Sequence, residues 1–135
     1  QVSEGRIAAY HDAKGLRSVA IDTDSDIFVS NDLVGISKFK LGNWETGLDR
    51  GRQREWIRST HIQAFDACRN CWARQLCAGG SRDHAYLTNG DVLSPDEAFC
   101  RSQKRLYEVA IGLYTSLSQT HPEVAARRFQ REQAA

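Results

Sequence analysis

The spacing of four cysteines limits what this chain can fold into more than any other feature. Cys68, Cys71 and Cys77 lie within ten residues, and Cys100 follows twenty-three positions after Cys77. Two residues separate Cys68 from Cys71, so both sulfurs can face one centre, and Cys77 can return to it after one compact turn. The next segment, Ala78-Gly79-Gly80, carries little side chain, so backbone amides can approach sulfur and donate hydrogen bonds. We therefore expect the four thiolates to converge on one inorganic centre.

Two identities are open for this centre. A [4Fe–4S] cluster is preferred, because zinc sites with four cysteines usually use two short Cys-x2-Cys pairs and this chain has only one. A zinc ion held by the same four cysteines is the alternative. Cys100 would add its thiolate near a helix N-terminus, where the helix dipole favours negative charge. Disulfides or buried structural thiols fit less well, since the cysteines are clustered, lie among polar residues and follow no signal peptide.

Composition is that of a globular domain. The 135 residues suffice to bury a core without disulfide or metal support. A formal net charge of +1, with scattered basic residues, argues against a nucleic-acid partner bound through phosphate attraction. No run of about eighteen apolar residues is present, so we expect no membrane partner, and the lack of a signal pattern favours the cytoplasm. Because the chain contains no Met, we expect it to be a processed product or a fragment of something longer.

Local patterns predict an α+β fold. Two β-rich runs, Val19-Ala20-Ile21 and Ile27-Phe28-Val29, flank a cluster of turn formers and predict a hairpin. A helix is expected from about Arg52 to Ala67, where it would deliver the chain to the cysteines. Asn89-Gly90 between apolar runs predicts a second hairpin, because both central residues of that turn need positive φ.

Helix signals dominate the rest of the chain. Ser94-Pro95-Asp96-Glu97 combines a cap, a proline suited to the first helical position and a capping-box glutamate, so a long helix should start here. Its apolar residues form a stripe expected to face the core, namely Phe99, Leu106, Val109, Ala110, Leu113 and Leu117. We also expect a weak helix that ends at Gly15 and a short last helix, from about Thr120, that includes Phe129.

The cysteine motif and its surroundings resemble a known family. Cys-x2-Cys-x5-Cys, then Gly-Gly, a Gly-Asp turn, a Pro-Asp-Glu cap and a final Cys, is similar to the SPASM domain. That domain is the auxiliary iron–sulfur domain at the C-terminus of many radical-SAM peptide-modifying enzymes. The run from Cys71 to Gly80 is particularly similar to maturases that build thioether or other cross-links in ribosomal peptides. Upstream, Asp22-Thr-Asp-Ser-Asp-Ile-Phe-Val-Ser30 resembles the family stretch "dGxiypC", and Phe39-Lys-Leu-Gly-Asn43 resembles "fklGNv".

Three positions depart from the family pattern. A full SPASM domain has seven cysteines and two clusters, whereas this chain has four cysteines. Asp12, Ser30 and Ser81 stand where the family has cysteine ligands of the first auxiliary cluster. Serine oxygen is a poor substitute for a soft thiolate on iron. The resemblance therefore implies one surviving [4Fe–4S] cluster, ligated by the four cysteines, and one vacant site.

The resemblance also implies a domain layout and a role. Residues 1–120 would form one SPASM-like domain, with a hairpin half over 1–50 that contains the vacant site and a cysteine-ligated half over 51–120. Residues 121–135 would be a short helix or tail. The implied role is electron relay, structural support and placement of a peptide substrate. The chain lacks the Cys-x3-Cys-x2-Cys motif for the cluster that cleaves S-adenosylmethionine, so it needs a radical-SAM core in cis or in trans and is not expected to be catalytic alone. A four-cysteine zinc module that binds a peptide or protein without redox chemistry is the alternative function.

Overall fold

The computed structural model describes residues 9–124, which divide into two compact units, 9–96 and 97–124. The first unit carries a four-stranded antiparallel sheet and several helices, and the second contains one long helix. This mixture is the α+β fold that the sequence predicts. Across residues 9–124, no helix combines the length and apolar character that a membrane span requires.

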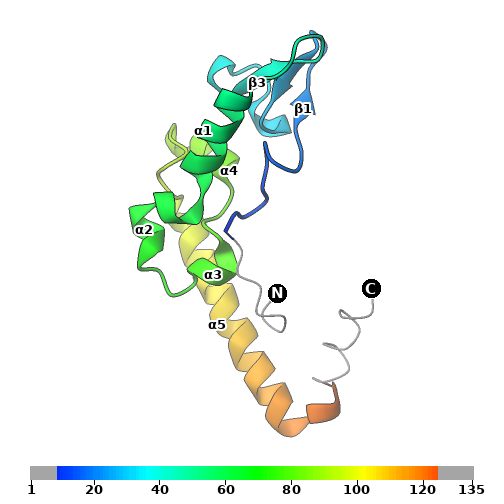
Figure 1. Cartoon of the computed structure of the whole chain (residues 1–135). Coiled ribbons are helices and arrows are strands. Elements are labelled where there is room, and N and C mark those ends of the chain that lie inside the picture. Colours follow the sequence, from blue (N-terminus) through cyan, green and yellow to red (C-terminus); the bar gives the residue numbers. More distant parts are fainter. Residues whose placement is uncertain (1–8, 125–135) are drawn as a thin grey trace. The chain divides into compact units, whose positions relative to one another are not determined.

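The sheet is formed by β1 (Ala20–Ile21), β2 (Asp26–Phe28), β3 (Lys40–Asn43) and β4 (Gly47–Leu48), paired in that order (Figure 1). The first two strands form the predicted hairpin, with Ala20 opposite Phe28. The carboxylate of Asp22 fixes the turn by accepting hydrogen bonds from the backbone N–H groups of Asp24 and Asp26. Two 3-10 turns, η1 (Asn31–Leu33) and η2 (Ser37–Phe39), connect β2 to β3.

Helix α1 (Arg50–Thr60) follows the sheet and leads toward the cysteines. Its first turn is capped by Asp49, whose carboxylate accepts two backbone N–H groups. The prediction of one helix as far as Ala67 is wrong. The backbone is extended at His61 (ψ 139°), which ends α1, and the chain continues through η3 (Ile62–Ala64) and α2 (Asp66–Arg69). This break lets the chain change direction before the first cysteine.

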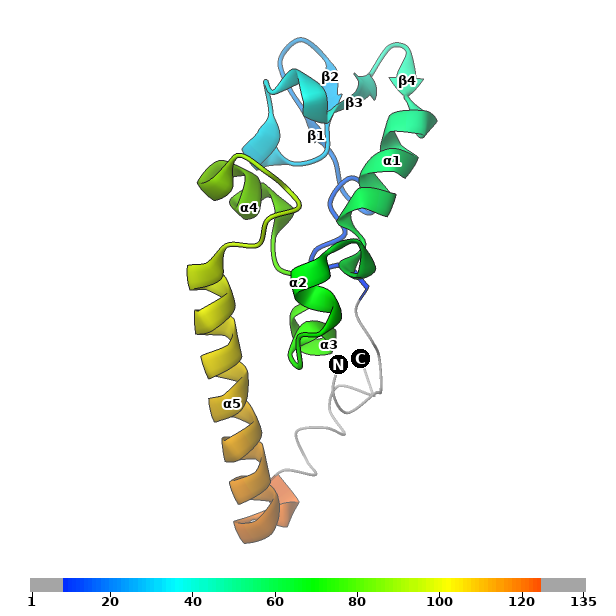
Figure 2. The ribbon, with the colours of Figure 1, turned by 90° about the vertical axis from the view of Figure 1, so that its left-hand side faces the viewer.

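Six buried side chains make the main core of the first unit: Ile27, Val29, Leu33, Phe39, Leu41 and Trp56. The ring of Phe39 lies edge-on to Trp56 of α1 and to Tyr86, with centroid separations of 5.6 and 4.8 Å. Tyr86 belongs to α4 (Arg82–Asn89), so helices from two distant parts of the sequence pack on the same core (Figure 2).

Helix α4 occupies the place of the predicted second hairpin, so that prediction is wrong. Asn89 is its last residue, and Gly90 follows with φ +75° in the left-handed conformation that closes many helices. An Asn-Gly pair suits both a hairpin turn and a helix end, because both need positive φ. The helix is favoured here because it buries Ala85 and packs Tyr86 against the core.

The second unit contains α5 (Glu97–Thr120), which confirms the predicted long helix. It begins two residues after Pro95, not at the proline. None of its residues is buried, and Leu106, Leu113 and Leu117 are between 43% and 59% exposed. The predicted core-facing stripe is therefore not packed into a core among the described residues.

The helices predicted at the two ends fall largely outside the described residues. Residues 122–124 are helical, as expected, whereas Phe129 lies beyond the described part. At the other end, residues 9–15 are not helical, because the chain turns at Ala13, where φ is +52°. The prediction of a helix reaching Gly15 is therefore wrong for that stretch.

Candidate metal centre

Short helices and turns position the three clustered cysteines in the first unit. Cys68 lies in α2, and Cys77 is the last residue of α3 (Arg74–Cys77). Between them, the N–H of Cys71 donates to the Cys68 carbonyl at 3.1 Å, and the Cys71 carbonyl accepts from the N–H of Arg74 at 3.2 Å. Cys68 is buried beside Phe65. The three residues therefore follow one another on successive tight turns.

Several neighbouring groups act on the thiol of Cys77. Burial raises the pKa of its thiol above the ordinary value, and this outweighs the opposing effect of backbone N–H groups of Gly79 and Gly80, which donate to the sulfur. The neighbouring Cys71 thiol raises the pKa further, whereas the Arg82 guanidinium lowers it. The predicted approach of glycine amides to a cysteine sulfur is therefore present at Cys77.

The backbone after Cys77 explains why glycines stand there. Ala78, Gly79 and Gly80 all have positive φ, at +53°, +90° and +73°. A Cβ atom at Gly79 would lie 2.9 Å from the Arg82 guanidinium, so a larger residue does not fit without displacement. This left-handed run turns both glycine amides back toward Cys77.

Cys100 lies in the first turn of α5, in the other compact unit, and is partly buried. No disulfide joins any of the four cysteines, all of which are in the described part of the chain. Within residues 9–124, no group of three or more His, Cys, Asp or Glu side chains has the arrangement of a metal site. The convergence of all four thiolates therefore stays a prediction.

The three positions predicted to be vacant ligand sites have different local roles. Asp12 is partly exposed and accepts from the backbone N–H of Lys14 at 3.3 Å. Ser30 immediately precedes η1, and its hydroxyl is buried without a hydrogen-bond partner in the part of the chain that the structure describes. Ser81 caps α4, where its hydroxyl accepts from the N–H of His84 at 3.5 Å.

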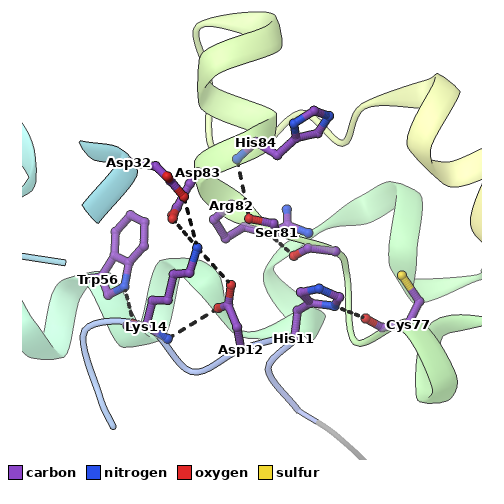
Figure 3. A network of polar contacts seen from close by, with 11 residues as sticks. His11, Asp12, Lys14, Asp32, Trp56, Cys77, Ser81, Arg82, Asp83 and His84 are labelled. Atoms are coloured by element: carbon purple, nitrogen blue, oxygen red, sulfur yellow. Dashed lines mark hydrogen bonds and ion pairs between the residues drawn. The ribbon is translucent and has the colours of Figure 1, made fainter. Parts of the chain in front are cut away.

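A polar network that the sequence did not indicate lies beside these positions. The Lys14 ammonium contacts the carboxylates of Asp12, Asp32 and Asp83 (Figure 3). Asp12 is itself a predicted vacant position, and Asp32 and Asp83 come two residues after Ser30 and Ser81, respectively. No local sequence pattern marks this network, because its three acids come from separate segments of the chain.

Arg82 connects this network to the cysteine loop. Its side chain is buried, and its guanidinium donates to the carbonyls of Gly80 at 3.2 Å and Val92 at 3.1 Å while lying 3.8 Å above the Phe65 ring. On the other side of the loop, the Nδ1–H of His11 donates to the Cys77 carbonyl at 3.0 Å. The loop that carries Cys77 is therefore held from two sides.

His84 lies seven positions after Cys77, so the sequence allows either an occasional ligand or a surface histidine with a hydrogen bond, and the surface histidine is the expectation. Its Nε2 atom lies 2.9 Å from the carboxylate of Asp96, and its side chain is 55% exposed. The structure thus agrees with the surface interpretation.

A groove lies along β3 and α1 in the first unit. Its volume is about 570 Å³, and its lining includes Phe39, Lys40, Arg52, Glu55 and Val92. Apolar and charged side chains therefore lie together in its lining.

In a comparison with known proteins, no protein-family model and no curated protein matches this chain. The resemblance to the SPASM domain therefore stays a prediction from the sequence motif.

Proposed function

We propose that this chain is an auxiliary [4Fe–4S]-binding module of a radical-SAM system that modifies a ribosomally made peptide. Cys68, Cys71, Cys77 and Cys100 would be the ligands. The observation that carries the proposal is the environment of Cys77, where two glycine amides donate to the sulfur and the Cys71 thiol lies nearby. Amide hydrogen bonds to sulfur and partial burial are the means by which proteins tune iron–sulfur clusters.

The chain's own residues have defined tasks in this proposal. The thiolates would hold the cluster, which supplies electron transfer when bound. Gly79 and Gly80 would stabilise negative charge on the Cys77 sulfur, and the left-handed backbone at these positions keeps their amides turned toward it. Cys100, in the first turn of α5, would supply the fourth thiolate.

A partner is required by this proposal. Radical generation from S-adenosylmethionine belongs to a separate core, joined in cis or acting in trans, because this chain lacks the corresponding three-cysteine motif. The groove that includes Lys40, Arg52 and Glu55 supports a role in positioning the substrate peptide, since charged side chains and apolar surface are available in one place.

Metal and sulfide analysis tests the proposal. The chain should be produced and purified without oxygen, and iron, acid-labile sulfide and zinc should be measured per chain. We expect about four iron and four sulfide per chain, with broad visible absorption. The Cys77→Ala variant should lose most of the iron, whereas Ser30→Ala, at a predicted vacant position, should retain it.

The alternative function predicts a different composition. One zinc per chain, no sulfide and no colour would support a four-cysteine zinc module that binds a peptide or protein, and it would contradict the iron–sulfur proposal. Loss of zinc in Cys77→Ala would then confirm that Cys77 is a metal ligand, but it would not support an iron–sulfur cluster. Absence of both metals from protein made without oxygen would contradict the common centre itself.

A further inference from the structure

One side of α1 lines the groove of the first unit. Arg52, Glu55, Trp56 and Ser59 stand at helix positions i, i+3, i+4 and i+7, so their side chains share one face of α1. Most of the remaining lining comes from a single continuous stretch, residues 37–41, which includes η2 and the start of β3. The groove is therefore bounded by one helix face and one short segment of chain.

The base of the groove is apolar and firmly packed. Val29, Phe39, Leu41 and Trp56 line it, and each is at most 8% exposed because all four also belong to the main core. A surface backed by a packed core keeps its shape, so a ligand does not have to order it on binding.

Positive side chains dominate the charge of the groove. Lys38, Lys40 and Arg52 line it together with one acid, Glu55. Lys40 is already paired with Asp26 at 2.5 Å. Lys38 and Arg52 are therefore the cations most open to a ligand.

The Lys38 ammonium is held in place by aromatic rings. It lies 3.8 Å from the ring centroid of Tyr86 and 4.9 Å from that of Phe39. Among the described residues no carboxylate lies within ion-pair distance of this ammonium, although Asp91 attracts it from farther away. Lys38 is thus positioned without a carboxylate partner of its own.

Arg52 also lacks a close carboxylate partner. Its guanidinium donates to the Lys40 carbonyl at 3.1 Å and lies 3.8 Å from Asp49, whose carboxylate already caps the backbone of α1. The Arg52 side chain is 56% exposed. The helix around it adds positive potential, because α1 contains four arginines and one acid, and the positive end of its dipole lies at its first turn.

A second hollow extends the groove past these cations. Its volume is about 490 Å³, it shares Lys40 and Arg52 with the groove, and it reaches Thr46 and Gly47 at the turn between β3 and β4. A ligand that passes Lys38 and Arg52 can therefore continue along the surface in an extended form.

We propose that this groove binds an extended acidic segment of polypeptide. Successive side chains of an extended chain point to opposite sides, so acidic side chains can meet Lys38 and Arg52 while apolar ones lie on the packed base. The assignment of this segment to the modified peptide rests on the proposed function. The binding itself does not, because it depends only on residues 29–92.

The groove is also connected to the cysteine loop. Val92 lines the groove, and its carbonyl accepts a hydrogen bond from the Arg82 guanidinium, which also donates to the Gly80 carbonyl. A peptide in the groove would therefore lie beside a residue that hydrogen bonds link to the segment after Cys77.

Peptide binding to the full chain tests the proposal. Three peptides of equal length, labelled with the same neutral fluorophore, should alternate leucine with glutamate, glutamine or lysine, and fluorescence anisotropy should give each Kd. The glutamate peptide should bind about tenfold more tightly than the glutamine peptide, since two exposed ion pairs each strengthen binding by up to about fivefold. The lysine peptide should bind more weakly than either.

Substitutions in the groove should act in opposite directions. Lys38→Gln and Arg52→Gln should each weaken binding of the glutamate peptide about three- to fivefold, whereas Arg52→Lys should retain most of it. Glu55→Gln should strengthen binding about twofold, because it removes a charge of the same sign as the peptide. Circular dichroism should confirm that each variant is folded.

Arg54→Gln is the matched control. It removes the same charge from the same helix two positions after Arg52, on a side of α1 that does not line the groove. It should change the Kd of the glutamate peptide by less than about twofold.

Four outcomes would overturn the proposal: no binding of the glutamate peptide, equal binding of the glutamate and glutamine peptides, tighter binding of the lysine peptide, or a loss in Arg54→Gln as large as that in Arg52→Gln. Metal and sulfide should be measured on the same samples, so that the two proposals are tested separately. Peptide binding by protein that holds zinc supports the groove and contradicts the proposed function. Iron–sulfur protein that does not bind the glutamate peptide supports the proposed function and overturns the groove.

Discussion

The Lys14 ammonium lies 2.5 Å from the Asp83 carboxylate, although sixty-nine positions separate the two residues in the sequence. Their contact ties the loop before the sheet to α4, the helix that begins immediately after the cysteine loop. The same loop is held by Arg82, the neighbour of Asp83, through the Gly80 carbonyl. The ion pair between Lys14 and Asp83 is thus linked, through Arg82 and the Gly80 carbonyl, to the segment that carries Cys77.

Alkaline pH should weaken the ion pair between Lys14 and Asp83. Burial lowers the pKa of Lys14, but the hydrogen bond and charge of Asp83, with Asp12 and Asp32, outweigh it, so the folded-state pKa lies above the ordinary value of 10.5. The stabilisation should therefore be complete below about pH 10.5 and should decrease as the pH rises through the folded-state pKa. Urea unfolding of wild type and Lys14→Met from pH 7 to 11.5 would measure this. The difference in unfolding free energy between them should stay constant up to about pH 10 and then shrink. A difference that grows with pH would contradict the expected sign.

A methyl group at Gly79 should damage both stability and metal binding. Gly79 has φ +90°, and its Cβ would lie 2.9 Å from the Arg82 guanidinium, so Gly79→Ala should cost about 2–3 kcal/mol of unfolding free energy. In protein that carries the proposed cluster, Gly79→Ala should also lower the iron content, because the amide that donates to Cys77 would be displaced. Gly90→Ala is the matched control, since Gly90 also has positive φ but no atom within 4 Å of the added Cβ. It should cost only about 1 kcal/mol and keep the metal. Equal metal loss in both variants would argue against a specific role of the Gly79 amide.

The Asn89-Gly90 pair shows that a local sequence pattern does not decide between a hairpin turn and a helix end. Its preference for positive φ is correctly predicted, but the same preference serves a hairpin turn and a helix end. The choice between them depends on Tyr86 meeting Phe39, a contact across forty-seven residues that no local pattern contains. By contrast, the β1–β2 hairpin was predictable because Asp22 closes its turn through bonds within four residues.

The candidate site also has one part that the sequence predicts and one part that it does not. The amide donors to Cys77 follow from two adjacent glycines, so their presence could be predicted from the motif. The Lys14 network could not, because Asp32 and Asp83 reach Lys14 only after η1 and α4 are folded against the loop before β1. A lysine with one acid two positions away is common on protein surfaces, and nothing local distinguishes this one.

Substitution by alanine should affect stability differently at Ser30 and at Ser81, the two serines at predicted vacant positions. Ser30 has a buried hydroxyl with no hydrogen-bond partner among the described residues, so Ser30→Ala removes an unsatisfied polar group and should be neutral or slightly stabilising. Ser81→Ala removes the cap of α4 and should cost about 0.5–1 kcal/mol, the low end because the bond to the His84 N–H is long at 3.5 Å. Ser81→Asp keeps a capping oxygen and serves as the control. Urea unfolding measures all three, and a Ser30→Ala variant less stable than Ser81→Ala would contradict these assignments.

Arg82 should affect the Cys77 centre through both its charge and its hydrogen bonds, and two substitutions separate these effects. Arg82→Met removes the charge and leaves the Gly80 and Val92 carbonyls without their donor, so it should cost about 2–4 kcal/mol of unfolding free energy. Arg82→Lys keeps the charge but loses the fork of donors, so it should also destabilise the fold. In protein that carries the proposed cluster, a positive charge near Cys77 favours the reduced state, so Arg82→Met should lower the reduction potential more than Arg82→Lys.

Potentiometric titration of the visible absorption would measure this ordering. Arg69→Met is the control, because Arg69 follows Cys68 directly in sequence but its guanidinium is largely exposed and paired with Asp66. Solvent screens such a charge, so the potential of that variant should match wild type. An Arg82→Met potential indistinguishable from wild type would mean that the guanidinium acts on the fold alone, and that the cluster does not experience its charge.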